Sequence, residues 1–256
     1  MHSRALYLDL LIRTLANTIY GDPNIDHWHD RVFDAALREQ GMDWPRDAHT
    51  MVGLARLRNL RELADLALAE DVPGDFIETG IWRGGCCILL RGVLAAWGDA
   101  QRRVYAADSF RGLPPASGRY AADLGDLNHS FAELAVSLAQ VQANFARYGL
   151  LDARTVFLEG LFQDTLPRLT DERFALIRLD GDMYESTIVA LDNLYPRLSP
   201  GGFVIIDDYG AIPGCRQAVA DFRARADITA EITQVDWTGV WWRKPAAEEC
   251  VDIVRT

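Results

Sequence analysis

The segment Leu176–Tyr209, LIRLDGDMYESTIVALDNLYPRLSPGGFVIIDDY, contains two runs of apolar residues, and acidic residues follow each run. Asp180 and Asp182 follow the first run, and Asp207 and Asp208 follow the second. The pattern predicts a buried strand, a helix, a Pro-Gly break and a second buried strand. Neighbouring parallel strands bring their carboxyl ends to one edge of a sheet, where α/β proteins bind ligands. Crowded carboxylates favour a hard divalent cation, so the segment predicts a Mg²⁺ or Mn²⁺ site.

Strands and helices alternate on both sides of this segment. Short apolar runs predict further strands at 76–78, 104–107 and 155–158, and longer patterns predict helices at 86–97, 133–148 and 214–225. Such alternation is typical of a parallel sheet with right-handed crossovers. Residues 228–236 and 239–243 predict a closing β-hairpin. The expected fold is therefore α/β and Rossmann-like, a mostly parallel seven-stranded sheet with helices on both faces and a final antiparallel hairpin.

Residues 1–72 predict a helical extension in front of an α/β domain at 73–256. Apolar side chains at helical spacing predict a helix over 4–20, interpreted as a packing helix, with a membrane or partner helix as the alternative. A second amphipathic helix is predicted over 51–70, and the stretch between them is irregular. We expect the extension to contribute to the cleft and to oligomer contacts. Residues 110–132 predict a long loop that forms a substrate wall or lid.

The composition restricts the class of protein. The chain has 256 residues, 49% of them apolar, and a net charge of −11, which argues against nucleic acid as the partner. Its four cysteines form no CxxC pattern, so neither a zinc site nor a disulfide framework is expected, which suits a reducing cytoplasm. Asp9 and Arg13 interrupt the apolar start, which is therefore neither a signal peptide nor a membrane span.

The turn after the first predicted strand, ETGIWRGG at 78–85, is rich in glycine. It matches neither GxGxxG nor a P-loop, and many such turns only pack a helix on a sheet. Asp108 ends the next predicted strand, where a carboxylate can accept both hydroxyls of a ribose, although it could instead cap the following turn. A glycine turn, a ribose acid and a metal cluster together point to S-adenosylmethionine.

Several motifs in order resemble the macrocin O-methyltransferase family, whose metal-dependent enzymes methylate sugar hydroxyls on antibiotics. They are PGDFIETGIWRGG at 73–85, ADSFRGLP at 107–114, FARYGLLD at 145–152, LDGDMYEST at 179–187 and YPRLSPGGFVIIDDY at 195–209, with LYLDLLIRT and AHTMVGLARLRNL nearer the start. The resemblance implies a class I methyltransferase fold, S-adenosylmethionine as donor, a homo-oligomer, and Mg²⁺ bound by Asp180, Asp207 and Asp208. The segment 115–135 departs from the family pattern.

Asp180 is the expected catalytic base as well as a metal ligand, because a carboxylate beside a metal-bound hydroxyl can take its proton. Asp182 is the alternative base, or else an acid that caps its own turn. Adjacent strand residues point to opposite faces, so Asp207 and Asp208 can share a metal only where the strand has ended. The alternative for this pair is one ligand and one structural acid.

The donor is expected to lie along the ends of the first three strands. The predicted donor-binding residues are Glu78, Thr79, Gly80, Arg83 and Gly84 at the methionine end, Asp108 and Ser109 at the ribose, and Phe162, with Gln163, at the adenine. Arg83 could pair with the donor carboxylate or with Glu78. His49 and Thr50 are expected to reach the cleft, and His129 could approach the acceptor.

The sequence thus predicts a Mg²⁺- and S-adenosylmethionine-dependent O-methyltransferase that acts on a deoxysugar hydroxyl of a natural-product glycoside. A catechol or another vicinal diol is the alternative acceptor, since two adjacent oxygens would chelate the metal equally well. A non-catalytic nucleoside-binding module is a second alternative. A nicotinamide oxidoreductase is disfavoured because GxGxxG is absent.

Overall fold

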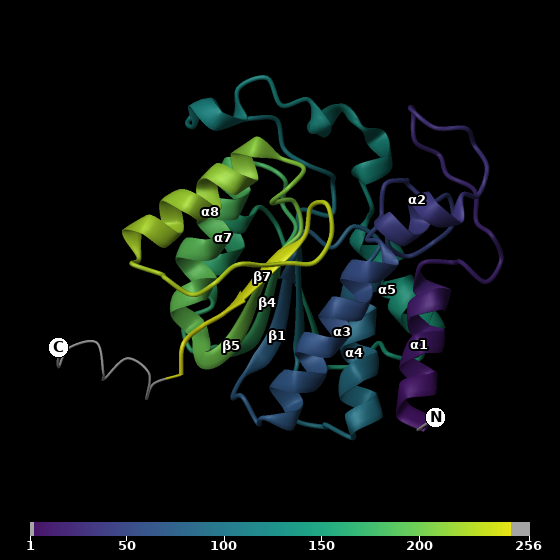
Figure 1. Cartoon of the computed structure of the whole chain (residues 1–256), viewed down its shortest axis with the longest axis horizontal. Helices are drawn as coiled ribbons and strands as arrows, with labels where there is room; N and C mark the ends of the chain where they lie inside the picture. Colours follow the sequence, from purple (N-terminus) through teal and green to yellow (C-terminus); the bar gives the residue numbers. More distant parts are fainter. Residues whose placement is uncertain (1–2, 247–256) are drawn as a thin grey trace.

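Seven strands form one sheet in the order β3-β2-β1-β4-β5-β7-β6 in the computed structural model, which describes residues 3–246 (Figure 1). The strands are β1 (Asp75–Thr79), β2 (Val104–Asp108), β3 (Thr155–Glu159), β4 (Phe174–Leu179), β5 (Leu198–Ile206), β6 (Thr233–Gln234) and β7 (Val240–Arg243). The first five run parallel, and β7 pairs antiparallel with both β5 and β6. This confirms the predicted α/β class, the seven-stranded sheet and the final hairpin.

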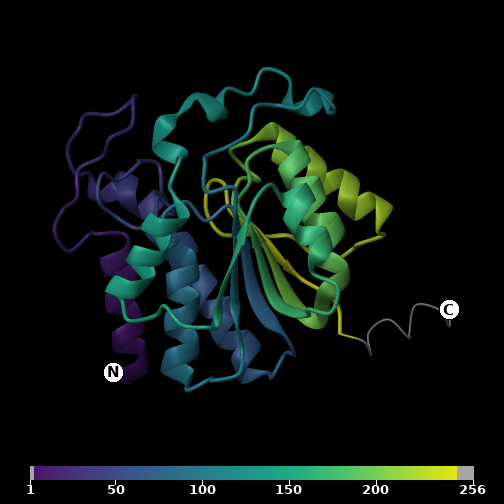
Figure 2. The same cartoon turned by 180° about the vertical axis from the view of Figure 1, so that it is seen from behind.

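Helices cover both faces of the sheet (Figures 1 and 2). One face carries α1 (Ser3–Leu15), α3 (Leu54–Ala69), α4 (Gly85–Trp97) and α5 (Leu138–Arg147), and the other carries α6 (Phe162–Thr165), α7 (Tyr184–Leu194) and α8 (Pro213–Arg225). Each face has its own apolar core. All six residues of β4 are buried, which explains why its sequence is apolar at every position except Arg178 and does not alternate.

Single turns of 3-10 helix and one short helix complete the described chain. They are α2 (Ala35–Gln40), η1 (Ala121–Asp123), η2 (Asn128–Ser130), η3 (Ala132–Leu134), η4 (Leu166–Arg168) and η5 (Tyr195–Arg197). No helix among residues 3–246 combines the length and hydropathy that crossing a bilayer requires. Cys86, Cys87 and Cys215 are buried free thiols, and Cys250 lies outside the described residues.

The structure corrects several predicted boundaries. The helix predicted over 133–148 begins only at Leu138, because Ser137 caps it by accepting a hydrogen bond from the Gln140 amide. The helix predicted over 4–20 ends at Leu15. The first hairpin strand, predicted over 228–236, is reduced to two residues at the sheet edge.

Residues 111–135 join β2 to α5 and arch over the carboxyl ends of the strands (Figures 1 and 2). We call this stretch the roof segment. Its single turns of 3-10 helix are separated by bends, and it covers the edge where ligands bind in α/β sheets. Several of its residues line the cavity described below, and a role as substrate wall or lid stays a prediction.

Candidate active site

A cavity of about 550 Å³ lies under the roof segment, at the carboxyl ends of the parallel strands. The turns after β1, β2, β3, β4 and β5 all contribute to its wall, together with Trp28 and Trp44 from the N-terminal section. An aromatic cluster closes one side: Phe131 of the roof segment packs edge-on against both tryptophans, with ring centroids 5.1 Å from Trp44 and 6.3 Å from Trp28.

The predicted metal ligands meet at one end of this cavity. Carboxylate oxygens of Asp180, Asp207 and Asp208 lie within 4.8 Å of one another. Leu179 pairs with Ile206, so β4 and β5 end level, and β5 stops before Asp207. The backbone bends there, and this meets the condition under which two adjacent acids can face one site.

Asp182 also lines the cavity, and its backbone amide donates to Asp208 Oδ2 at 3.1 Å. Its φ is +58°, a conformation that aspartate adopts more readily than most residues. Trp82 and Phe110, which follow β1 and β2, also have positive φ. For bulky residues that conformation costs free energy, and such strain gathers at functional sites.

Two buried arginines hold Asp207. Arg178 Nη2 donates to Asp207 Oδ1, and Arg56 Nη1 donates to Asp207 Oδ2. Arg178 also donates to Glu78 Oε1 and, at 2.9 Å, to Asp180 Oδ2. Arg56 continues the network to Asp236 at 2.9 Å. These ion pairs therefore connect β1, β4, the end of β5, α3 and the β6–β7 hairpin.

Negative charge exceeds positive charge at this end of the cavity. Six carboxylates, those of Glu78, Asp180, Asp182, Asp207, Asp208 and Asp236, surround the guanidiniums of Arg56 and Arg178. Burial, and then repulsion from neighbouring acids, raises the pKa of Asp180 and of Asp208 well above its ordinary value and that of Asp182 to about 7. A divalent cation with oxygen ligands would relieve this repulsion, so these carboxylate oxygens are suitable ligands for Mg²⁺.

The opposite end of the cavity holds the residues predicted to bind the ribose. Asp108 Oδ2 accepts from the Ile81 amide at 2.8 Å, and Oδ1 accepts from the Phe110 amide at 2.7 Å. Burial raises the pKa of Asp108. Ser109 Oγ donates to Gly112 O at 2.6 Å. Asp108 therefore caps two turns, which agrees with the alternative that it caps the turn after β2. It also borders the cavity.

Glu78 is fully enclosed between its partners. Its Oε1 accepts from Arg178, and its Oε2 accepts from the Cys87 thiol at 2.9 Å. Burial and the neighbouring Glu78 carboxylate raise the pKa of Cys87 well above its ordinary value, which keeps the thiol protonated as a donor. Arg83 does not pair with Glu78, so that alternative is wrong.

We call residues 78–85, which follow β1 and were predicted to bind the methyl donor, the donor turn. Contacts with other parts of the protein are enough to require its glycines. A Cβ on Gly80 would lie 1.5 Å from the carbonyl oxygen of Asp180, and one on Gly85 would lie 2.5 Å from that of His49. A Cβ on Gly84 would meet Phe145 at 2.9 Å. Close approach of protein to protein therefore explains this glycine pattern without a ligand.

Of the predicted donor residues, Glu78, Gly80, Asp108, Ser109 and Phe162 line the cavity, with Gln163; Thr79, Arg83 and Gly84 lie outside its lining. Arg83 Nη1 instead donates to the carbonyls of Pro45 and Ala48, at 3.2 and 2.8 Å. This ties the donor turn to the N-terminal section.

Thr50 lines the cavity, whereas His49 and His129 do not. His49 Nδ1 lies 2.7 Å from the Tyr148 hydroxyl, and burial, with Arg147 and Arg83 nearby, lowers its pKa to about 4. His49 thus stays neutral and joins the N-terminal section to the end of α5. Its position indicates a structural contact.

Sequence reasoning missed the two arginines and two residues of the roof segment, Asp123 and Asn128. Arg178 could have been identified from the sequence, because a charged residue inside an apolar strand needs a buried partner. Glu78, the acid within the neighbouring strand, pairs with it in register. Arg56, Asp123 and Asn128 approach the site only through tertiary folding, and no local pattern indicated them.

Comparison with known proteins places this geometry in a family. Residues 4–244 match the macrocin-O-methyltransferase (TylF) family. A 4'-O-methyltransferase of 8-demethyl-8-(2,3-dimethoxy-alpha-L-rhamnosyl)-tetracenomycin-C from Streptomyces olivaceus is 54% identical, over 96% of this chain and 95% of that protein. Mycinamicin III 3''-O-methyltransferase from Micromonospora griseorubida is 49% identical, over 94% and 97%.

Solved structures agree with the fold. The O-methyltransferase NovP has a TM-score of 0.91 at 45% identity, covering 95% of this chain and 100% of that one. An O-methyltransferase from Bacillus cereus in complex with SAH has a TM-score of 0.52 at 14% identity, over 93% and 90%, which supports the class I fold alone. The predicted fold and family are confirmed: the chain belongs to the macrocin-O-methyltransferase family and is an O-methyltransferase.

Proposed function

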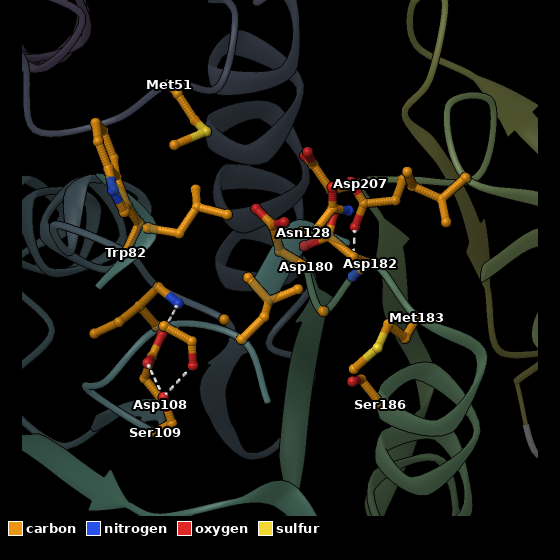
Figure 3. A pocket seen from close by; sticks show the side chains of 18 of the residues that line it. Met51, Trp82, Asp108, Ser109, Asn128, Asp180, Asp182, Met183, Ser186 and Asp207 are labelled. Atoms are coloured by element: carbon orange, nitrogen blue, oxygen red, sulfur yellow. Dashed lines mark hydrogen bonds between the residues drawn. The ribbon is translucent and has the colours of Figure 1, made fainter. Parts of the chain in front are cut away.

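We propose that this protein transfers a methyl group from S-adenosylmethionine to a hydroxyl of a deoxysugar on a natural product, with Mg²⁺ bound by Asp180, Asp207 and Asp208. One observation supports the proposal: these acids and Asp108, the proposed ribose ligand, line one cavity, and Figure 3 draws Asp108 apart from Asp180 and Asp207. The relatives named above are named for a rhamnosyl-bearing tetracenomycin and for mycinamicin III, and a third, 46% identical, is named demethyldecarbamoylnovobiocin O-methyltransferase, from Streptomyces niveus.

The chemistry divides between the bound groups and the chain. When bound, S-adenosylmethionine supplies an electrophilic methyl group, and Mg²⁺ lowers the pKa of the attacking hydroxyl. Asp180 takes the proton at Oδ1, because its Oδ2 already accepts from Arg178. Asp182, whose pKa is about 7, is the alternative base.

The cavity favours a glycoside over a nucleotide sugar as acceptor. Among the described lining residues the only cationic side chain is Arg56, which is committed to Asp207 and Asp236. Arg and Lys side chains bind a diphosphate strongly, and the described lining offers none that is free. Large exposed apolar residues contribute to the lining instead, namely Trp28 and Trp237, and Met42 and Leu127 directly adjoin lining residues in the chain. These side chains would contact an apolar aglycone outside the sugar site.

The proposal extends to the N-terminal section, the oligomeric state and the location of the enzyme. We propose that the N-terminal section, residues 1–72, forms part of the acceptor wall and contributes to a homo-oligomer, and that the enzyme works in the cytoplasm. Trp28, Trp44 and Thr50 support the first part, because they line the cavity. The oligomer is testable by light scattering of the purified chain.

A competition between acceptors tests the function. The enzyme is incubated with S-adenosylmethionine and Mg²⁺ and with matched deoxysugar glycosides, the corresponding nucleotide sugars, and catechols. Methylated glycoside is the expected product, identified by mass spectrometry. Methylation of catechols alone, or of nucleotide sugars alone, would contradict the proposed acceptor. Calorimetric titration with S-adenosylmethionine and with NAD checks the donor, and heat with NAD alone would reject it.

A further inference from the structure

The roof segment contains one buried residue, and that residue is a carboxylate. Between Arg111 and Ala135, Asp123 is the single residue classed as buried, with 4% of its surface exposed. It makes no ion pair with the described residues. Burying a carboxylate costs free energy unless hydrogen bonds or a charge compensate it, so its partners show what holds the segment.

Those partners are the first amides of α7. Asp123 Oδ1 accepts from the Tyr184 amide at 2.6 Å, and Oδ2 accepts from the Glu185 amide at 2.9 Å. The N-cap residue of this helix, Met183, provides no side-chain cap. Asp123 therefore supplies the cap from 61 residues away, at the positive end of the helix dipole. Tyr120 adds a ring contact with Tyr184 at 4.8 Å between centroids.

This cap fixes the roof segment next to the acids. Helix α7 begins two residues after Asp182, so the capped amides follow directly on the turn that carries Asp180 and Asp182. The other end of the segment is held separately, because Trp82 Nε1 donates to Glu133 O at 2.9 Å. The stretch between Asp123 and Glu133 is thus anchored on both sides of the cavity.

Asn128 lies between these anchors and lines the cavity. Figure 3 draws it at the end of the cavity where Asp180, Asp182 and Asp207 are labelled, apart from Asp108 and Ser109. Its backbone amide donates to Asp126 Oδ1 at 2.9 Å, whereas its carboxamide makes no hydrogen bond with the described residues. A carboxamide both donates and accepts, so it can bind a hydroxyl next to the one that reacts.

We propose that Asn128 contacts the acceptor sugar during methyl transfer, and that Asp123 is a positioning residue that holds Asn128 there by capping α7. The proposal rests on the proposed function and adds to it the residue that selects among neighbouring sugar hydroxyls. Asp123 lies outside the cavity lining, and Figure 3 draws Asn128 apart from Asp108 and Ser109, so we expect both residues to affect the acceptor and not the methyl donor.

A double-mutant cycle in the full-length enzyme tests the link. Asn128→Ala removes about one hydrogen bond to the acceptor and lowers kcat/KM for the glycoside about tenfold. Asp123→Ala has a similar effect because it displaces Asn128. The double variant also loses about tenfold, not a hundredfold, since both changes remove the same contact. The affinity for S-adenosylhomocysteine stays within about twofold of wild type in all three. Additive losses, or a kcat/KM within about twofold of wild type in either single variant, would overturn the proposal.

Asp99→Ala is the matched control. Asp99 also accepts from two backbone amides, those of Gln101 and Arg102 at 2.8 and 2.9 Å, in the connection that leads into the amino end of β2. This variant should lower the melting temperature without changing acceptor kinetics. Asp123→Asn keeps an accepting oxygen without the charge, and is expected to fall between wild type and Asp123→Ala.

Limited proteolysis gives a second measurement that needs no turnover. Trypsin can cleave after the exposed Arg111 and Arg119, which precede the cap. With S-adenosylhomocysteine bound, Asp123→Ala should be cut at these sites at least about tenfold faster than wild type and than Asp99→Ala. Equal rates would refute the anchoring role. Because this result does not depend on the acceptor, it separates failure of the anchor from failure of the proposed function.

Discussion

Replacing Arg178 with methionine should destabilise the enzyme by several kcal/mol. Arg178 is 1% exposed and donates to Glu78, Asp180 and Asp207. Asp207 keeps Arg56, and the Asp180 side chain is 26% exposed, so the cost falls mainly on Glu78, which retains only the Cys87 thiol. Leaving one buried charge unpaired costs about 3–5 kcal/mol. That is a large part of the roughly 5–15 kcal/mol by which a domain is stable.

Arg91→Met is the matched control for this prediction. Arg91 is equally buried, at 1% exposed, but its one ion pair is with Asp152, which is 42% exposed. Two of its nitrogens, Nε and Nη1, have no partner among the described residues. Water can therefore solvate Asp152 after the substitution, and the expected change is about 1 kcal/mol or less.

Urea unfolding followed by circular dichroism measures both variants. The free energies of unfolding are compared at equal m-values, so that a change in the denatured state is recognised. A loss below about 1 kcal/mol in Arg178→Met, or an equal loss in Arg91→Met, would refute the reasoning that the acid network depends on this guanidinium.

Two further predictions concern the site, and a third concerns the structural contact made by His49. Asp180→Asn should keep its fold and its affinity for S-adenosylhomocysteine and lose about 10²–10⁴-fold in kcat; a smaller loss there than in Asp182→Asn would transfer the role of base to Asp182. EDTA should abolish turnover, and Mg²⁺ should raise the melting temperature of wild type more than that of Asp208→Asn; equal shifts would exclude Asp208 as a ligand. His49, with a pKa near 4 in the folded chain, should make the free energy of unfolding fall as pH drops from about 6.5 towards 4, because only the unfolded chain takes up the proton. His49→Gln should flatten that slope in pH-dependent denaturation, and an unchanged slope would show that other groups cause it.

Local patterns predicted the elements well because strands buried on both faces have a distinctive composition. The strand predicted at 104–107 is Val104–Asp108 in the structure, and the acids after β4 and β5 meet because the two strands end level. The short helix α2 was missed, since its six residues are too few for a periodic signal. Its Asp34 cap and the left-handed Gly41 that ends it were the available cues.

The electrostatic arrangement of the site was less predictable. Which arginine meets which acid depends on tertiary contacts, such as that between Arg56 of α3 and Asp207 after β5. The role of Asp123 could not be predicted either, because a carboxylate and the helix that it caps, 61 residues away, share no local sequence pattern. The glycines of the donor turn were predicted to matter, but the structure gives them a packing role that composition could not distinguish from ligand binding.

The contact between Gly80 and Asp180 also determines how accurately the two halves of the site are spaced. Their backbones touch directly, and a Cβ on Gly80 would be 1.5 Å from the Asp180 oxygen, where ordinary contact begins near 3.4 Å. An alanine there would therefore force the halves about 2 Å apart. Misplacement by about 1 Å can cost a hundredfold in rate. In the proposed mechanism, main chain and not side chains would set this spacing, so the distance that the methyl group travels should be insensitive to rotamer fluctuations.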